Sequence, residues 1–544
     1  MAKARKAVFT VTTYNKEGRN IGTTTGFYIS ETGEALSAYK PFNGASRAVV
    51  TDADGNNLPV ASIVGADDLY DVVKFKVSVP KKVEYLPLAT DPAPAGTAYL
   101  LSYSPTKAPS YKEGSIAETS KLKDAYSYYK LSIPIESGQM NAPWLLPSGE
   151  VFALAQEDAA GKKETSYGVS AGYANSLRYS SVDAFNSVYT KIGIRKAWPA
   201  DAEQAAVSLF LLAGSQDATA YLETLGDFIA TFPDSEDGYT SRASLYATRY
   251  AELSIARDEC LKLASADINI AAKLSKNKAQ ALYKQAEIIY RVASGDTTIT
   301  DSNWSLETAA AIIRQAITLE DTPAYRLLEG DISYSQENFP AAYEAYLQAA
   351  HSESSPSSYY MAAKSLENIP GSQISDIIAL LDSAITKMGT PVPKGAAQYV
   401  LERVNHKMQL NLYKEAVEDY DLYYYLSDGK VNDSFYYYRE QAKSRAGDND
   451  GAILDIREAI RLNAQVPDYY AEEAAILVRL QKYGEALQSI TKALALEPEF
   501  ASCYRLQGVC YIRQEKKAEA CQSFNKAKEM GDPLVARLIR EHCQ

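Results

Sequence analysis

Short apolar runs alternate with turn residues over positions 1–190, the pattern of an antiparallel β-protein. Valine, isoleucine, threonine and tyrosine fill the runs, and glycine, proline, asparagine and aspartate separate them. The number of such runs is about the number of strands that two packed six-stranded barrels require. We expect strands at residues 7–14, 25–30, 35–38, 48–52, 59–65, 72–78, 98–102, 114–119, 128–133, 151–156 and 167–171.

The pattern changes between residues 193 and 203. We expect an amphipathic helix over residues 181–192 that packs on the barrels, and Trp198 and Pro199 then interrupt the periodicity. Beyond this point the apolar positions recur with the helical period to the end of the chain. We therefore predict an all-β domain at 1–193, a linker at 194–203 and an all-α region from 204.

The C-terminal third contains an internal repeat with a period of about 34 residues. Alanines recur at this spacing as Ala452, Ala486 and Ala520, and again as Ala459, Ala493 and Ala527. The last unit resembles the tetratricopeptide repeat (TPR), with Tyr504, Gly508, Tyr511, Ala520, Phe524 and Ala527 on the large and small positions of that family. Small residues let the two helices of a hairpin approach closely. The resemblance implies a superhelix of about eight hairpins over 204–532, closed by a capping helix at 533–544.

A second resemblance lies in the loop that precedes residue 151. Gly138, Pro143 and the run Gly149-Glu150-Val151 stand in register with the nucleophile loop of trypsin-like serine proteases, most closely the HtrA type. The resemblance implies a double β-barrel, so the fold class is a multidomain chain with a trypsin-like double β-barrel and an all-α TPR superhelix. Met140 occupies the place of the serine, and a thioether has no proton to lose and cannot form an acyl-enzyme.

The other triad positions are also altered. Residues 36–45 resemble the family's histidine loop with Lys40 in the histidine's place, and residues 64–75 resemble the stretch whose aspartate falls on Asp71. The chain's histidines, His351, His406 and His542, all lie outside this domain, so a histidine-based triad is excluded there. No catalytic residue, metal ligand or cofactor is predicted, and the chain is expected not to be an enzyme.

Two interpretations of these residues stay open. In one, Met140 and Trp144 fill the former cleft, Lys40 reaches solvent and Asp71 bonds to nearby backbone. In the other, Ser137 is the nucleophile of an active peptidase with Lys40 as its base, if burial lowers the lysine pKa. Aligning Ser137 with the family's serine shifts the register, so that Pro143 no longer matches the proline of the family's loop.

The composition excludes some classes of binding partner and favours others. The net charge of -12 argues against nucleic acid, and no apolar run approaches the length that crosses a bilayer. The 41 tyrosines favour amphipathic contacts and protein partners. The five cysteines are an odd number and are expected to be packed thiols.

One column of residues in the repeats is a candidate peptide-binding surface. Arg445, Arg479 and Arg513 recur with the period of the repeat on the first helix of successive hairpins, the helix that lines the concave groove of such arrays, and Tyr437 lies on the same side. Aligned guanidinium groups bind the carboxylates of a peptide or an acidic partner segment. The alternative is that the arginines are only solvated, or pair with the nearby Glu440, Glu473 and Asp455. The family's clamp for free C-terminal carboxylates is not carried over, because Tyr437 and Gln441 stand where its Lys and Asn fall.

These observations favour a non-catalytic pseudoprotease–TPR adaptor that binds peptides or proteins through the groove and the former cleft. The alternatives are the Ser137/Lys40 peptidase, or a barrel that only caps the repeats while the groove alone binds. HtrA-like proteins mostly work outside the cytoplasm, so we expect a periplasmic or secreted protein, with the cytoplasm as the alternative.

Overall fold

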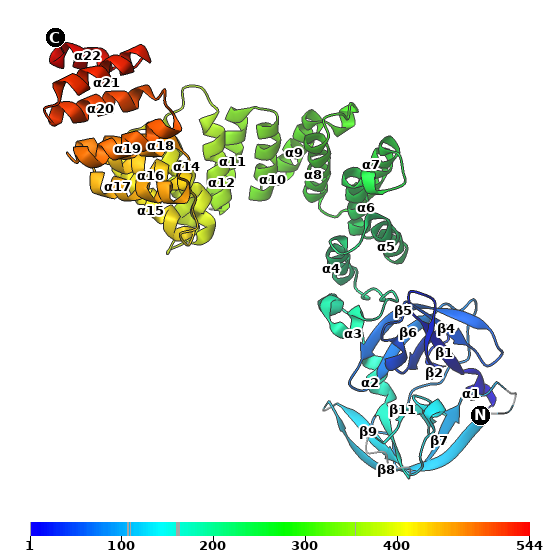
Figure 1. Ribbon diagram of the computed structural model, residues 1–544. Coiled ribbons are helices and arrows are strands. Elements are labelled where there is room, and N and C mark those ends of the chain that lie inside the picture. The colour runs from blue at the N-terminus through cyan, green and yellow to red at the C-terminus, as the bar shows by residue number, and fades with distance from the viewer. Residues whose placement is uncertain are drawn as a thin grey trace. The chain divides into compact units, whose positions relative to one another are not determined.

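The structure is a computed structural model of the chain and describes residues 2–105, 108, 110–123, 125–158, 164–353 and 355–543. It divides into two compact units, Met1–Ser275 and Lys276–Gln544. Strands and short helices form the start of the first unit, and helical hairpins form the rest of the chain (Figure 1).

Two closed six-stranded antiparallel barrels make up the β region, as expected. In the first, the strand order is β1-β2-β3-β6-β5-β4, with β1 Val8–Tyr14, β2 Asn20–Tyr28, β3 Glu34–Ser37, β4 Arg47–Thr51, β5 Asn57–Asp67 and β6 Val72–Val77. In the second it is β10-β11-β12-β9-β8-β7, with β7 Thr97–Ser102, β8 Ser110–Leu122, β9 Tyr126–Leu131, β10 Pro143–Leu145, β11 Val151–Gln156 and β12 Ser166–Ser170. Buried and part-exposed residues alternate along β1 and β9, which explains why their pattern is visible in the sequence.

Two expectations for this region need correction. Strand β10 was not predicted, because it has three residues and begins with a proline. The helix expected over 181–192 is wrong: the chain forms a 3₁₀ turn, η3 Ser181–Phe185, and then a short helix, α3 Ser187–Thr190. Asn186 starts the second helix by accepting a hydrogen bond from the Val188 N–H at 3.0 Å, so the two pieces do not merge.

The linker after α3 is a fixed part of the first unit. Ile63 on β5 donates its N–H to the Arg195 carbonyl at 2.8 Å and accepts from the Ala197 N–H at 2.7 Å. The helices of this unit are α1 Ala2–Lys6, α2 Ala171–Ser176, α4 Ala202–Ala213, α5 Ala218–Thr231, α6 Glu236–Thr248 and α7 Arg257–Leu274. The linker is therefore hydrogen-bonded to β5 of the first barrel before the helices begin.

The second unit is a succession of antiparallel helical hairpins. Its helices are α8 Lys278–Gly295, α9 Leu306–Leu319, α10 Pro323–Ser335, α11 Phe339–Glu353, α12 Pro356–Glu367, α13 Ile374–Lys387, α14 Ala397–Gln409, α15 Tyr413–Leu426, α16 Asp433–Ala446, α17 Asn449–Leu462, α18 Pro467–Arg479, α19 Tyr483–Leu496, α20 Ala501–Arg513, α21 Lys517–Glu529 and α22 Val535–His542. A Cβ on Gly508 would lie 2.4 Å from the Phe524 ring. This close approach requires a small residue at that position of the last hairpin.

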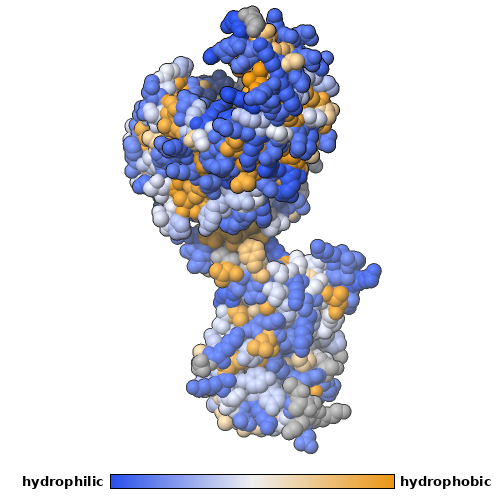
Figure 2. Space-filling view, turned by 60° about the vertical axis from the view of Figure 1, so that its left-hand side comes forward, coloured by the Kyte–Doolittle hydropathy of each residue, from blue (hydrophilic) through white to orange (hydrophobic). Residues whose placement is uncertain are grey.

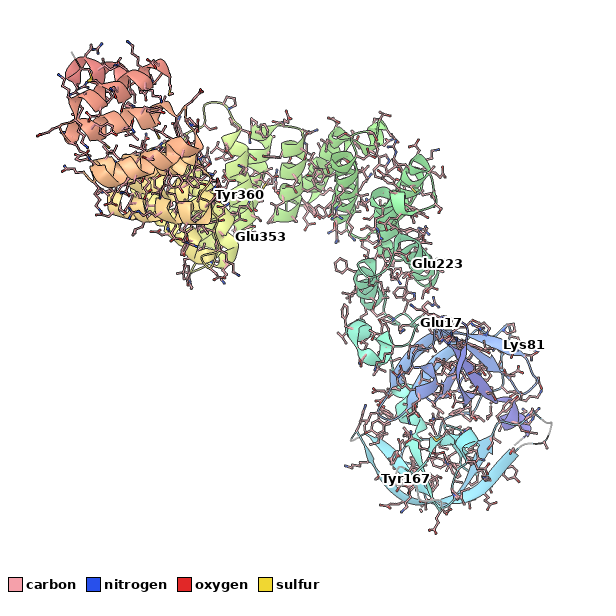
Figure 3. All side chains as sticks on the ribbon, in the orientation of Figure 1. Glu17, Lys81, Tyr167, Glu223, Glu353 and Tyr360 are labelled. Atoms are coloured by element: carbon pink, nitrogen blue, oxygen red, sulfur yellow. A yellow bond between two sulfur atoms is a disulfide. The ribbon has the colours of Figure 1, made fainter. Side chains whose placement is uncertain are left out.

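Tyrosines pack between elements in both units. Tyr167 stacks on Tyr128 across β12 and β9, with ring centroids 5.5 Å apart, and Tyr360 stacks on Tyr399 across α12 and α14 at 4.6 Å. Figure 3 labels Tyr167 and Tyr360 on their elements. On the face that Figure 2 shows, apolar residues form small groups separated by polar ones. Among the described helices, none combines the length and the apolar character needed to cross a membrane.

One cysteine expectation is wrong. Cys521 on α21 and Cys543 after α22 form a disulfide, with Cα atoms 5.6 Å apart, whereas Cys260, Cys503 and Cys510 are buried free thiols as expected. The odd number of cysteines excludes a complete set of disulfides but not a single bond. The bond fastens the terminal helix α22 to the last hairpin.

Candidate functional site

The residues in the family's histidine and aspartate positions lie together in the first barrel. Lys40 begins the 3₁₀ turn η1, Lys40–Phe42, just after β3, and Asp71 lies between β5 and β6 with a positive φ of 51°. The Lys40 N–H donates to Asp71 Oδ1 at 2.7 Å, and the Lys40 ammonium lies 3.7 Å from Oδ2. Asp71 therefore holds the main chain of the turn that carries Lys40.

The two side chains differ in their exposure. The Lys40 side chain is 77% exposed, whereas that of Asp71 is 10% exposed. Burial raises the pKa of the Asp71 carboxyl above its usual value, and hydrogen bonds and the charge of Lys40 oppose the rise. The arrangement suits a structural carboxyl that organises a turn.

The loop in the nucleophile position is tied to both barrels. The Gly138 carbonyl accepts a hydrogen bond from Thr25 Oγ1 on β2 at 3.1 Å, and the Thr25 carbonyl accepts from Ser37 Oγ at 2.6 Å. Within the loop, the Gln139 amide donates to Ser102 Oγ at 3.0 Å. Met140 follows and is partly buried. The loop thus lies beside the strand ends of the first barrel from which the Lys40 turn departs.

Trp144 does not fill the former cleft, contrary to the expectation. It lies on β10, is fully buried and belongs to the core of the second barrel together with Tyr129 and Phe152. Between Met140 and this strand, Asn141 adopts a positive φ of 58° and donates its N–H to the Ala155 carbonyl at 2.7 Å. Trp144 is therefore a core residue that anchors the loop's end.

Ser137 begins the 3₁₀ turn η2, Ser137–Gln139, in the same loop. Its side chain lies outside the described part of the structure, so its distance to Lys40 is not defined. A lysine that acts as a general base has to be neutral, which burial away from carboxylates favours. Lys40 is instead exposed and next to Asp71.

The predicted arginine column is exposed on successive first helices. Arg445 lies near the end of α16, and Arg479 and Arg513 are the last residues of α18 and α20. Arg479 donates to Asn449 Oδ1 at 3.0 Å and also to Ser444 Oγ, both in the preceding hairpin. The Arg445 guanidinium lies 5.7 Å from the centroid of the Tyr413 ring.

The acids that were the alternative partners of these arginines are engaged elsewhere or unpaired. Asp455 accepts two hydrogen bonds from Arg439, at 2.6 and 2.8 Å, and Glu473 lies 2.9 Å from Arg457 Nε. Within the described residues, neither carboxylate oxygen of Glu440 has a hydrogen-bond partner. The described part of the chain accordingly has no ion pair between the arginine column and a carboxylate.

Glu440 is a buried acid in the hairpin of α16 and α17. It is 0% exposed and occupies the position that Ala474 and Gly508 occupy in the next two repeats. Burial raises its pKa to about 8; the negative charge of Glu472 adds to the rise, and the positive charges of Arg479 and Arg445 oppose it. Burial also raises the pKa of Glu472. A protonated Glu440 leaves the positive charge of the nearby arginines less compensated.

Tyr437 faces the next first helix of the array. Its ring centroid lies 5.1 Å from that of Tyr469 on α18, and burial raises the pKa of its hydroxyl. It is partly buried, so part of the ring contributes to the surface.

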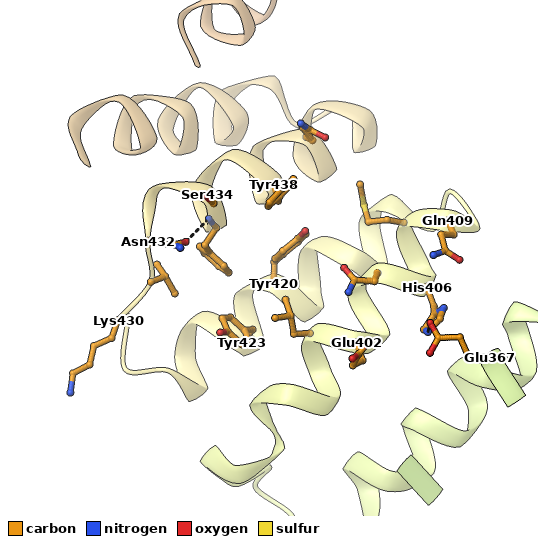
Figure 4. A pocket seen from close by; sticks show the side chains of 16 residues that line it. Glu367, Glu402, His406, Gln409, Tyr420, Tyr423, Lys430, Asn432, Ser434 and Tyr438 are labelled. Atoms are coloured by element: carbon orange, nitrogen blue, oxygen red, sulfur yellow. Dashed lines mark hydrogen bonds and ion pairs between the residues drawn. The ribbon is translucent and has the colours of Figure 1, made fainter. Parts of the chain in front are cut away.

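A pocket of about 880 Å³ lies between the first helices α14 and α16 and was not predicted. Figure 4 shows Tyr420, Tyr438, Asn432 and His406 around it. His406 is 4% exposed, and its Nδ1 has no hydrogen-bond partner among the described residues. The polar residues Asn405, Gln409 and Gln441 also line the pocket. Their helical spacing is visible in the sequence, but the pocket depends on how neighbouring hairpins pack.

Comparisons with known proteins agree with the two parts of this architecture. Residues 24–154, from β2 into β11, match the family model of the trypsin-like peptidase domain. Residues 471–533, from α18 past the end of α21, match the model of the tetratricopeptide repeat. The chain joins a trypsin-like peptidase domain to tetratricopeptide repeats.

Solved structures and curated proteins add little beyond this. Structures described as the HtrA-type protease AlgW with tripeptide, and a variant of it with tripeptide, are each 16% identical to this chain with a TM-score of 0.28. Each match covers 32% of this chain and 59% of the other, so this chain spans about 59% of the length of those structures. A comparison with curated proteins finds no match.

Proposed function

We propose that the chain is a non-catalytic adaptor that binds protein segments through its repeats and holds a second segment in its trypsin-like domain without cutting it. The observation that carries the proposal is the arginine column. Arg445, Arg479 and Arg513 are exposed on the first helices of successive hairpins, without a carboxylate ion pair in the described residues. Such a surface suits a peptide rich in Asp and Glu.

The polar pocket beside the column extends this binding surface. Asn405 and Gln441 lie on α14 and α16 and provide both hydrogen-bond donors and acceptors, which suits the backbone of an extended peptide. Tyr438 adds an exposed aromatic ring, a side chain that is common at protein interfaces. We infer that an acidic segment with aromatic or apolar residues lies along α14, α16, α18 and α20.

The proposal treats the trypsin-like domain as inactive. Met140 stands in the serine's place, Lys40 in the histidine's place, and no histidine precedes residue 351. The contact between Lys40 and Asp71 supports a structural role for both. The rival function, a peptidase that uses Ser137 and Lys40, requires a neutral lysine, and the exposure of Lys40 beside a carboxylate disfavours it.

A binding experiment tests the role of the groove. The full chain is titrated with a fluorescent peptide of alternating Glu and Tyr, and with a matched peptide of alternating Lys and Tyr. We expect saturable binding of the acidic peptide only, and an affinity about tenfold lower in the Arg479→Ala/Arg513→Ala variant. Arg461→Ala is the control, because Arg461 lies on the second helix α17 and pairs with Glu458 at 2.8 Å. Equal affinity of the double variant and the parent protein would contradict the groove proposal.

The part played by the barrel is tested separately. If the former cleft holds a segment, Met140→Arg in the full chain weakens capture of unfolded casein and leaves binding of the acidic peptide unchanged. If the barrel is only a cap for the repeats, Met140→Arg changes neither measurement. Casein capture and acidic-peptide binding thus distinguish a protein that binds through both barrel and groove from one that binds through the groove alone.

We propose a periplasmic or secreted location for the protein. The disulfide between Cys521 and Cys543 supports it, because structural disulfides persist in oxidising compartments and are rare in the cytosol. Thiol labelling of the protein, rapidly quenched from the producing cells, tests the proposal. Protection of both cysteines from labelling supports it, and labelling of both supports the cytoplasm.

A further inference from the structure

A second cavity lies within the first unit, where the linker meets the first helices. It has a volume of about 460 Å³, within the range of small-molecule sites. Its walls are mainly apolar and come from α3, the linker and α4, with Tyr189, Ile194, Trp198, Leu211 and Leu212 among them. Residues of α5, Thr224 and Asp227, complete the lining, and nothing proposed above uses this cavity.

The walls of this cavity are held in place by specific contacts. Trp198 donates its indole N–H to Asp227 Oδ2 at 2.7 Å, and its ring packs edge-on against Phe228 at 5.3 Å between centroids. Arg195 forms an ion pair with the same carboxylate. Together with the bonds of the linker to Ile63, these contacts make the cavity a preformed site rather than a gap between loose segments.

Among the described residues, three charged side chains line the cavity: Arg195, Lys196 and Asp227. Arg195 and Asp227 pair with each other, so the positive charge of Lys196 has no carboxylate partner among them. The Lys196 ammonium donates to the carbonyls of Ile192 and Ile194, the latter at 2.9 Å. Carbonyl groups orient the ammonium but do not neutralise it. Burial lowers the pKa of Lys196 to about 8, as expected for a cation that its surroundings leave uncompensated.

The entrance to the cavity is apolar. Phe185 lines the cavity and is also 79% exposed, which places it at the mouth. On α4, which carries Leu211 and Leu212, Phe210 is 78% exposed and Val207 is 52% exposed. Exposed aromatic and aliphatic side chains next to a preformed cavity indicate contact with an apolar group.

We propose that this cavity binds a small amphipathic anion, a monocarboxylate with an apolar tail, whose carboxylate pairs with the ammonium of Lys196. The single unbalanced positive charge selects one negative charge, and the apolar walls select the tail. The carboxylate replaces solvent around Lys196, and the tail covers Tyr189, Trp198 and Leu212 and extends toward Phe185.

Titration of the full chain with octanoate and with 1-octanol tests this site. The two probes have the same number of carbon atoms and differ in charge, and Trp198 gives a fluorescence signal because it lines the cavity. We expect saturable binding of octanoate, about tenfold tighter than that of 1-octanol. Equal binding of the two probes, or no binding of octanoate, overturns the proposal without the use of any variant.

Three variants locate the site. Lys196→Met removes the charge but keeps an unbranched side chain, and it is expected to reduce octanoate affinity to that of 1-octanol. Lys191→Met, at an exposed position earlier in the same segment, is expected to bind octanoate like the parent protein. Leu212→Trp fills the cavity and is expected to remove binding of both probes. Unchanged octanoate affinity in Lys196→Met, or equal losses in both lysine variants, would show that the anion binds elsewhere.

Discussion

The carboxylate of Asp71 accepts a hydrogen bond from the main-chain N–H of Lys40 at 2.7 Å, and the Lys40 side chain extends into solvent. In the family that this domain resembles, these positions hold an aspartate and a histidine of a catalytic triad. Here the pair joins the turn after β3 to the connection between β5 and β6. A contact of this kind stabilises the barrel whether or not the domain has any activity.

Asp71→Ala is expected to destabilise the first barrel by about 1–3 kcal/mol, because it leaves a partly buried N–H of the Lys40 turn without its acceptor. Lys40→Ala is expected to cost less than about 1 kcal/mol, since its ammonium is exposed and its ion pair is largely screened by solvent. Urea denaturation followed by the fluorescence of the tryptophans measures both. Equal losses in the two variants would contradict this structural role of Asp71.

Glu440 is expected to make the stability of the repeats depend on pH. Its folded-state pKa of about 8 lies above the value of an unfolded glutamate, so the folded state binds the proton more tightly. Its contribution to stability is therefore fully present below pH 4.5 and is lost as the pH rises through 8. Glu440→Gln should match the parent protein at pH 4 and exceed its free energy of unfolding by up to about 4 kcal/mol at pH 9.

The control for Glu440 is Glu418→Gln, a change at an exposed glutamate of α15. This variant should follow the parent protein at both pH values. Urea denaturation monitored by circular dichroism at 222 nm is the measurement. A parent protein with the same pH dependence as Glu440→Gln would show that Glu440 ionises normally.

Gly508→Ala is expected to destabilise the last hairpin by about 1–3 kcal/mol, because the new Cβ would lie 2.4 Å from the buried Phe524 ring. Gly484→Ala is the matched control. It lies on α19, where an added Cβ would meet no described neighbour within 4 Å, so the higher helix propensity of alanine should leave the stability unchanged or raise it by up to about 1 kcal/mol. Thermal denaturation of the two variants is the measurement. A loss in Gly508→Ala alone would show that close packing requires the glycine, and equal stability of both variants would contradict this.

Cys543→Ser is expected to loosen the terminal helix α22. The disulfide joins Cys521 to Cys543 across 22 residues, and loss of such a crosslink typically costs about 3 kcal/mol. Hydrogen–deuterium exchange of residues 535–542 should rise in the variant, and the parent protein should match it after reduction. If exchange of α22 is the same with and without the disulfide, apolar packing of Val535, Leu538 and Ile539 is enough to hold the helix.

The barrels and the repeats could be predicted because their periodicities extend over many residues. Buried positions alternate along the whole of β1, and alanines recur at one fixed spacing as Ala452, Ala486 and Ala520. Each pattern therefore repeats the same structural signal several times. Strand β10 has three residues and offers no such repetition. The break between η3 and α3 depends on the side chain of Asn186, which competes with a continuous helix for a backbone N–H.

The candidate sites were harder to predict from the sequence than the fold. The family resemblance placed Lys40 and Asp71 in one site, and the structure brings them into contact. It also placed Trp144 in the cleft, whereas the pleat of β10 turns this side chain into the barrel core. The pocket between α14 and α16 and the cavity beside Lys196 arise from contacts between distant segments, which no local pattern encodes.

We propose that the trypsin-like domain has no peptidase activity, and a single incubation tests this proposal. The full chain is mixed with unfolded casein and with a serine-reactive phosphonate, and the masses of casein and of the protein are measured over a day. We expect intact casein and no phosphonate adduct. An adduct on Ser137, or cleavage of casein that Ser137→Ala abolishes, would show that the domain is an active peptidase.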